Sequence, residues 1–258
     1  MRLLFLGHSG TTGGALQRAE DAYPYLVLRA LQEARPNQEH DVVIRPLVPT
    51  PTAAEYAEKV CRQVEPDVVV VQTLAYPLLA TVDARVRHLF PRLYPQYARL
   101  RDALARLLAP PARTRPTRHL YSGLRSLLRA ILGAELPLTP ESSAGIYCAV
   151  LRSLAALESP SIIVISSSLM HSRIEREIPG TNANISRFHD LLRACAERMN
   201  VPFIDRARAF DAARDTLYSE DGIHTNAAGH RLTAELLLPH LLALGSSSRV
   251  QEPFPGRG

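Results

Sequence analysis

Residues Asp67–Gln72 read DVVVVQ and give the strongest strand signal of the chain. Four consecutive valines leave no polar face, and such a run is typical of a strand buried on both sides in a parallel sheet. Shorter runs rich in apolar and β-branched residues predict four more strands, at Arg2–Leu6, Asp41–Arg45, Ser161–Ser166 and Pro202–Asp205. The chain therefore has enough strands for one five-stranded parallel sheet.

Stretches with helical spacing of apolar residues lie between these strands. They cover Leu16–Gln32, Ala53–Val64, Ile185–Met199 and Asn226–Leu244. Alternation of strands and helices predicts an α/β fold, a three-layer α/β/α sandwich with a flavodoxin-like strand arrangement. In open sheets of this kind the active site lies beyond the carboxyl ends of the strands.

A long segment from Leu78 to about Ser142 interrupts the alternation and exceeds an ordinary connection. It is rich in Arg and Leu, and its apolar residues have helical spacing in Arg99–Leu108 and Leu124–Leu132, around a proline-rich stretch at 110–116. We predict one domain over residues 1–245 with a helical insertion at about 78–142, and a disordered tail at 246–258.

Two interpretations of this insertion stay open. Its helices either pack on the sheet edge or form a cap over the strand ends, whose apolar underside would bind an acyl chain. Its arginines would suit an acyl-carrier protein, a CoA phosphate or peripheral contact with lipid headgroups.

The overall composition is that of an ordinary globular protein. Of the 258 residues, 46% are hydrophobic and 21% charged, and the formal charge of +5 comes without a nucleic-acid-binding motif, so we expect no nucleic-acid partner. No apolar run is long enough for a transmembrane segment and no signal peptide is recognisable, which favours a cytoplasmic protein. The cysteines Cys61, Cys148 and Cys195 have no metal-ligand spacing, and we expect reduced thiols and no metal.

The first candidate site follows the first predicted strand in the glycine-rich stretch Leu6–Gly14, LGHSGTTGG, which contains Ser9. Backbone N–H groups at such a strand-to-helix turn hold negative charge, either a phosphate or the oxyanion formed when Ser9 attacks a carbonyl. The stretch lacks the lysine of a P-loop. A serine that merely caps a helix is the structural alternative.

The second candidate site lies before the last predicted helix, where Asp221 precedes His224 by three residues. A carboxylate so close can orient the imidazole, which leaves its other nitrogen free to take a proton from a serine hydroxyl. Thr225 or Asn226 can cap the helix that follows.

Together the two sites resemble the SGNH (GDSL-type) hydrolase family. Gly7-His8-Ser9 stands where the family usually has Gly-Asp-Ser, and Asp221–His230 is close to the family form Asp-x-x-His-Pro-Asn-x-x-Gly-His. The resemblance implies a flavodoxin-like fold, with Ser9 as nucleophile, His224 as base and Asp221 as the group that orients it. It also implies ester or thioester hydrolysis, or acyl transfer, without a metal or organic cofactor.

The chain departs from the family pattern at the two positions that usually supply oxyanion donors. The family's Gly-x-Asn-Asp block here reads Thr73-Leu74-Ala75-Tyr76, so Ala75 replaces the asparagine. The glycine of the second block falls in a stretch that begins with Pro46, and proline has no N–H to donate. The chain is thus an atypical member in which the Ser9 N–H is the donor carried over. Gln72 is one candidate substitute donor, and the residues expected to contact substrate or replace the donors are Gly10, His8, Thr50, Thr73, Ala75, Tyr76 and His171.

The leading hypothesis is a serine esterase, thioesterase or acyltransferase that forms an acyl-Ser9 intermediate on a small-molecule, CoA-linked or carrier-linked ester with an apolar acyl group. The alternative is a degenerate SGNH-fold protein that binds a ligand or partner without acyl chemistry. An anion- or nucleotide-binding module that uses the glycine-rich turn is a third possibility.

Overall fold

The computed structural model of the protein describes residues 1–108, 131–157 and 159–247. Within it the chain divides into two compact units. The first comprises Met1–Ala75 together with the chain from Pro140 onward, and the second comprises Tyr76–Thr139. The first unit contains all five strands and both candidate sites.

The sheet has the order β2-β1-β3-β4-β5, and every neighbouring pair of strands is parallel. The strands are β1 (Arg2–Gly7), β2 (Asp41–Pro46), β3 (Val68–Gln72), β4 (Ser161–Ile165) and β5 (Phe203–Ile204). All five agree with the predicted strands to within one residue at each end. The order is the flavodoxin-like one, and the predicted fold class is confirmed.

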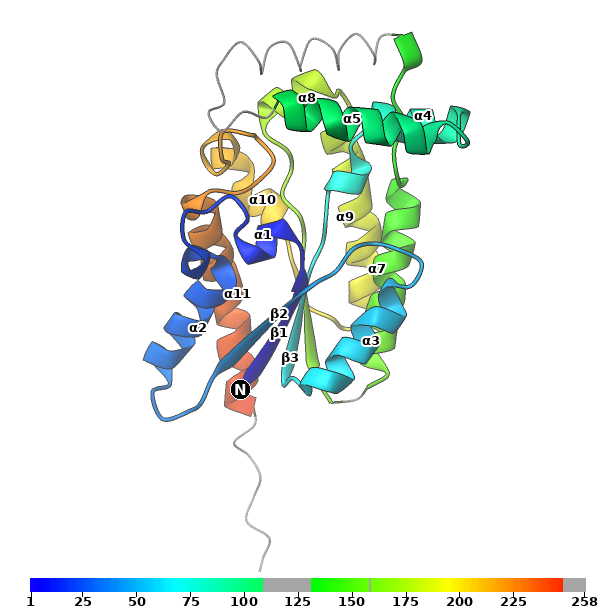
Figure 1. The fold of residues 1–258 in the computed structure, drawn as a ribbon. Helices are drawn as coiled ribbons and strands as arrows, with labels where there is room; N and C mark the ends of the chain where they lie inside the picture. Colours follow the sequence, from blue (N-terminus) through cyan, green and yellow to red (C-terminus); the bar gives the residue numbers. More distant parts are fainter. Residues whose placement is uncertain (109–130, 158, 248–258) are drawn as a thin grey trace, which may run out of the picture. The chain divides into compact units, whose positions relative to one another are not determined.

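Helices cover both faces of this sheet (Figure 1). On one face α2 (Tyr23–Ala34) packs beside α11 (Ala227–Ser247), and on the other α7 (Pro140–Ala155) packs between α3 (Ala53–Val64) and α9 (Thr181–Arg198). Three shorter helices lie near the carboxyl ends of the strands: α1 (Ser9–Thr12), α8 (Ser172–Glu177) and α10 (Arg206–Phe210), the last followed by a 3₁₀ helix (Asp211–Thr216).

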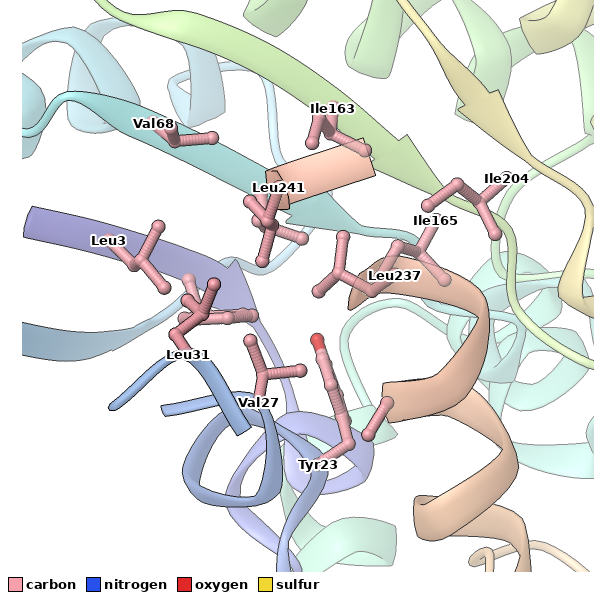
Figure 2. Close-up of a cluster of buried hydrophobic side chains, with 13 residues drawn as sticks. Leu3, Tyr23, Val27, Leu31, Val68, Ile163, Ile165, Ile204, Leu237 and Leu241 are labelled. Carbon is pink, nitrogen blue, oxygen red and sulfur yellow. The ribbon is translucent and has the colours of Figure 1, made fainter. Parts of the chain in front are cut away.

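The run of valines in β3 is explained by the two covered faces. Val68 and Val70 belong to the cluster beneath α2 and α11, and because successive side chains of a strand alternate, Val69 and Val71 point to the opposite face. All four are at most 2% exposed. Burial of each such side chain stabilises the fold by about 1.5–3 kcal/mol. Figure 2 shows the cluster, with labelled residues Leu3, Tyr23, Val27, Leu31, Val68, Ile163, Ile165, Ile204, Leu237 and Leu241.

Two helix predictions need correction. The helix predicted at Leu16–Gln32 begins only at Tyr23, because the preceding residues form a loop with a short 3₁₀ helix and Pro24 sits in the first turn, where no N–H is required. Helix α7 was not predicted at all. Its buried face starts with Pro140, Ser143 and Ala144, so an apolar stripe is present only in its later turns, from Tyr147 to Leu154.

The second unit is helical within its described residues, as predicted for the insertion. After a 3₁₀ turn, α4 (Val82–Leu89) begins at Thr81, whose Oγ1 accepts the N–H of Ala84 at 3.1 Å, and α5 (Tyr94–Leu108) follows. The proline-rich stretch at 110–116, most of the predicted helix at 124–132 and residues 248–258 of the predicted tail lie outside the described residues. The role of the insertion as a cap stays a prediction.

Cys148 and Cys195 form a disulfide with a Cα–Cα distance of 6.2 Å, which contradicts the expectation of three reduced thiols. The two residues lie 47 positions apart on α7 and α9 and meet because these helices pack together, which their spacing cannot reveal. Cys61 is free and buried. In the part of the chain that the structure describes, no helix has the length and apolar character to cross a membrane, and no group of three metal-binding side chains is found.

Candidate active site

The turn between β1 and α1 places Ser9 just beyond the carboxyl end of β1. A Cβ on Gly7 would lie 1.8 Å from the Thr11 Oγ1, so only glycine fits there. The buried Thr11 hydroxyl accepts the backbone N–H of His8 at 3.2 Å and donates to the Oε1 of Gln72 at 2.5 Å. The turn that carries Ser9 is therefore held against the end of β3.

The loop before α11 is organised around the Asp221 carboxylate. Its Oδ1 accepts the backbone N–H groups of Ile223 at 2.9 Å and His224 at 3.0 Å, and its Oδ2 lies 2.6 Å from the Nδ1 of His224. Burial raises the pKa of Asp221, but these hydrogen bonds from His224 and Ile223 outweigh burial and hold the pKa below its ordinary value. Asp221 is thus ionised at neutral pH and accepts the Nδ1 proton of His224.

The two candidate sites meet at the Ser9 hydroxyl, although 215 positions separate the residues that form the contact. The Oγ of Ser9 lies 3.0 Å from the Nε2 of His224. Asp221, His224 and Ser9 therefore form one continuous chain of hydrogen bonds, in which the imidazole is placed to take the hydroxyl proton. About a third of each of the Asp221 and His224 side chains is exposed, so the chain of bonds is open to solvent.

A second imidazole contacts the same hydroxyl. The Nδ1 of His8 lies 3.2 Å from the Oγ of Ser9. Burial, and to a smaller extent the neighbouring His224, lower the pKa of His8 below its ordinary value, so this ring is neutral at neutral pH. The predicted contact of His8 with substrate stays a prediction, whereas its contact with Ser9 is part of the structure.

Asn226 fixes the position of the histidine loop on α11, as predicted for a cap. Its Oδ1 accepts the N–H groups of Ala228 at 3.0 Å and Gly229 at 3.1 Å, and its Nδ2 donates to the carbonyls of Thr216 and Tyr218. The amide thereby satisfies helix donors that have no intrahelical acceptor and ties the loop at both ends.

His230, near the start of α11, contacts the loop that carries His224 through Thr225. It is 2% exposed, its Nδ1 accepts the N–H of Tyr23 at 3.2 Å, and its Nε2 lies 3.3 Å from the Thr225 Oγ1. Burial first, and then the positive charge of Arg206, lower the pKa of His230 to about 4. This histidine is a neutral structural residue.

His171 contacts the same loop from the side of β4. Its Nδ1 accepts the N–H of Arg173 at 3.0 Å and thereby caps α8. Gly222 has a φ of 71°, and a Cβ there would lie 3.2 Å from both the His171 Cβ and an Arg173 guanidinium nitrogen. Arg173 also donates to the Glu220 carbonyl at 2.9 Å. His171 therefore packs against the loop that carries Asp221, and its predicted contact with substrate stays a prediction.

The remaining predicted contact residues have varied surroundings. Thr73 is buried and its Oγ1 accepts the N–H of Ser167 at 2.6 Å, so its hydroxyl links β3 to β4. Thr50 is exposed and its hydroxyl lies 3.3 Å from that of Thr52. Ala75 is buried and offers no side-chain donor, while Tyr76 is 53% exposed and opens the second unit.

Two supporting contacts escaped prediction. The bond from Thr11 to Gln72 has no local signal in the sequence because the partners lie 61 positions apart. Ser167 and His189 form a second serine–histidine contact of 2.9 Å, but both are buried. Burial lowers the pKa of His189 to about 4, and the pair lies in the core.

Comparison with solved structures supports this fold assignment. A catalytic mutant of Axe2, an acetylxylan esterase from Geobacillus stearothermophilus, matches with a TM-score of 0.56 at 17% identity over 93% of both chains. TesA matches at 0.57 and 13% over 95% of this chain and 99% of its own, and the acetyl xylan esterase AlAXEase at 0.57 and 14% over 93% and 100%. At these identities the likeness concerns the fold. No protein-family model and no curated protein sequence matches the chain.

Proposed function

We propose that the protein is a serine hydrolase of SGNH type that acts on ester bonds through an acyl-Ser9 intermediate. The observation that carries this proposal is the chain of hydrogen bonds from Asp221 through His224 to the Ser9 hydroxyl, with contacts of 2.6 and 3.0 Å. A nucleophile within reach of a base that a third group orients is the general arrangement for covalent acyl chemistry.

In the proposed mechanism, the Ser9 Oγ attacks the carbonyl carbon of the ester while the Nε2 of His224 takes the hydroxyl proton. Asp221 stabilises the imidazolium that forms and keeps its own ionised state. The imidazolium then protonates the leaving alcohol or thiol, and water or another acceptor releases the acyl group from Ser9 by the same steps in reverse order.

The oxyanion needs donors other than those of the family pattern. The N–H groups of Ser9 and Gly10 are at the first turn of α1, where a helix offers them no internal acceptor. We assign the oxyanion to these two groups. Since Ala75 lacks a side-chain donor, it is not assigned to the oxyanion. The Thr73 hydroxyl accepts the Ser167 N–H and keeps its own proton to donate, so it stays a candidate third donor.

Related residues in a structural neighbour support the assignment of roles. Catalytic mutants of the Geobacillus stearothermophilus acetylxylan esterase replace a serine, an aspartate and a histidine with alanine, and its aspartate and histidine lie three positions apart. Asp221 and His224 have the same spacing. The neighbours named as esterases also favour an ester as the substrate.

The finer assignment is an ester or thioester with an apolar acyl group, with the insertion as a cap over it. The apolar and arginine residues of the insertion support a bulky acyl chain attached to CoA or a carrier. If the cap excludes water, acyl transfer to another acceptor competes with hydrolysis.

The test of the ester-bond proposal is turnover of p-nitrophenyl acetate by the wild type and the S9A variant. Turnover by the wild type and its loss in S9A, with an unchanged melting temperature, is the expected result. Absence of turnover in the wild type would favour the second candidate, a binding protein without acyl chemistry, which the missing donor at Ala75 supports.

A series of p-nitrophenyl esters from acetyl to decanoyl tests the acyl preference separately. We expect kcat/KM to rise with chain length, since each additional methylene buried from water contributes about 0.8 kcal/mol at most. Equal values across the series would contradict an apolar acyl site and leave the esterase proposal standing.

A further inference from the structure

When His224 is neutral, the hydrogen bonds around Ser9 form one consistent arrangement of protons. The ionised Asp221 accepts the Nδ1 proton of His224, so the Nε2 of a neutral His224 carries a lone pair. The Ser9 hydroxyl has a single proton and donates it to this Nε2 at 3.0 Å.

With the hydroxyl proton directed to His224, the second contact of the Ser9 Oγ is one in which Oγ accepts. Its partner, the Nδ1 of His8 at 3.2 Å, has to carry a proton. The lowered pKa of His8 agrees with a neutral ring, and the contact with Oγ requires the tautomer that has its proton on Nδ1. His8 is thus a neutral N–H donor to the oxygen that reacts.

The backbone holds His8 in place from both sides. Its N–H donates to the Thr11 hydroxyl at 3.2 Å, and its carbonyl accepts the N–H groups of Thr11 at 2.7 Å and Thr12 at 3.1 Å. A donor fixed in advance stabilises developing charge more than one that must reorient, so the position favours a role in the reaction.

We propose that His8 is a catalytic hydrogen-bond donor that stabilises negative charge on the Ser9 Oγ while the acyl group leaves. This inference rests on the proposed acyl-Ser9 function. Water attacks the acyl carbon as His224 takes one of its protons; then the bond from carbon to Oγ breaks and its electron pair returns to Oγ. The Nε2 proton of His224 moves to Oγ, and His8 retains its own Nδ1 proton throughout.

The donor favours deacylation over acylation for a chemical reason. In acylation the Oγ lone pair forms the new bond, and a donor on the same oxygen stabilises that pair before the attack as well. In the acyl-enzyme, the same donor withdraws electrons from the ester oxygen, activates the carbonyl and then stabilises the leaving oxygen. Removal of His8 should consequently slow release of the acyl group more than its attachment.

The experiment is stopped-flow hydrolysis of p-nitrophenyl acetate, with acylation read from the burst and deacylation from the steady state. We expect H8A to deacylate about tenfold or more slowly, below the 10²–10³-fold loss typical of a short oxyanion contact, because this contact is 3.2 Å long. Acylation should change by less than about threefold, and the acyl-enzyme should accumulate in intact-mass spectra.

Two further variants separate the donor role from a structural one. H8N places an amide N–H where the Nδ1 proton lies and should restore deacylation to within about threefold of the wild type. H8Q places its amide one bond further along and should be slow like H8A, and it serves if H8A fails to fold.

Wild-type deacylation in H8A, or H8N as slow as H8A at an unchanged melting temperature, would overturn the inference. Equal loss of acylation and deacylation in every variant would assign His8 a structural role and overturn it too. If the wild type forms an acyl-Ser9 adduct and these outcomes occur, the proposed function stands and only the role of His8 fails. Without any adduct on the wild type, both fail.

Discussion

Two groups of residues at the carboxyl edge of the sheet differ in how completely they match the SGNH pattern. One contains Ser9, Asp221 and His224, where every polar side-chain atom of the proposed attacking group has a partner within 3.0 Å. The other lies at the ends of β2 and β3. Pro46, the last residue of β2, and Ala75, after β3, stand at positions that the SGNH pattern uses to stabilise charge. The hydrogen bonds that the proposed attack requires are thus all present, whereas in the proposed reaction other groups would have to stabilise the oxyanion.

This difference indicates that stabilisation of the transition state, and not formation of the nucleophile, would be the unusual property of the reaction. A complete nucleophile and base generate the attacking oxygen, and the donors limit how well the transition state is stabilised. We therefore expect a protein that forms acyl-Ser9 readily with activated esters and reacts slowly with unactivated ones.

The largest effect is expected from D221N. An amide at this position keeps an oxygen for the loop N–H groups but presents an N–H to His224, which fixes the wrong tautomer and removes the base. We expect kcat/KM for p-nitrophenyl acetate to fall by about 10³–10⁴ with little loss of stability. The neighbouring exposed Glu220, changed to Gln, is the control and should stay within about twofold. Activity of D221N within tenfold of the wild type would remove Asp221 from the mechanism.

The buried His230 makes the free energy of unfolding depend on pH. His230 has a pKa of about 4 in the folded state and about 6.5 when unfolded, so between these values the unfolded chain binds a proton that the folded chain does not. The free energy of unfolding should consequently be highest above pH 6.5 and fall by up to about 3 kcal/mol as the pH drops to 4.

Urea unfolding at several pH values measures this dependence. H230N keeps an acceptor for the Tyr23 N–H and should flatten the slope between pH 4 and 6.5, while His189, which shares the shift, retains its own part. H240N changes an exposed histidine of the same helix and should leave the slope as it is. An unchanged slope in H230N would show that His230 is not buried as a neutral group.

The A75N variant tests the missing oxyanion donor, because it places an amide where the family pattern has an asparagine. We expect kcat to rise by about tenfold, a part of the 10²–10³ that one such donor contributes, since Ala75 is buried and the larger side chain strains its surroundings. A75V adds similar bulk without a donor and should not raise the rate. A rate for A75N no higher than that of A75V would show that other groups already supply full stabilisation.

The smallest effect is expected from T11V. The Thr11 hydroxyl joins the His8 backbone to Gln72, and its loss leaves a buried donor and acceptor unpaired at a cost of about 1–3 kcal/mol. Displacement of the Ser9 turn should lower kcat about threefold. T12V changes the exposed neighbour and is the matched control for both stability and rate. Equal stability of the two variants would show that Thr11 does not anchor the turn.

Much of the fold could be predicted because its signals are local. Strands buried on both faces, such as Val68–Gln72, need continuous apolar side chains, and the alternation with helices then limits the topology. Helix α7 is missed because its first turns bury Pro140, Ser143 and Ala144, so the apolar stripe covers only its later turns, from Tyr147 to Leu154. The Cys148–Cys195 pair escaped for the related reason that only helix packing brings the two residues together.

In the candidate site, too, contacts within one loop could be predicted from spacing and contacts between distant segments could not. Asp221 and His224 act within one loop, so their spacing alone predicts their contact. The contact of His224 with Ser9 follows only from the rule that strand ends share an edge, together with a family resemblance. The anchoring of Thr11 on Gln72, and the engagement of Thr73 by Ser167, join residues 61 and 94 positions apart and have no local signal.

Covalent labelling with a reagent specific for activated serines shows whether Ser9 is a nucleophile that His224 activates. The wild type and S9A would each be treated with a fluorophosphonate and their intact masses measured. The account predicts one adduct on the wild type, located on Ser9 by peptide mapping, and none on S9A. An unlabelled wild type, or equal labelling of both proteins, would contradict it.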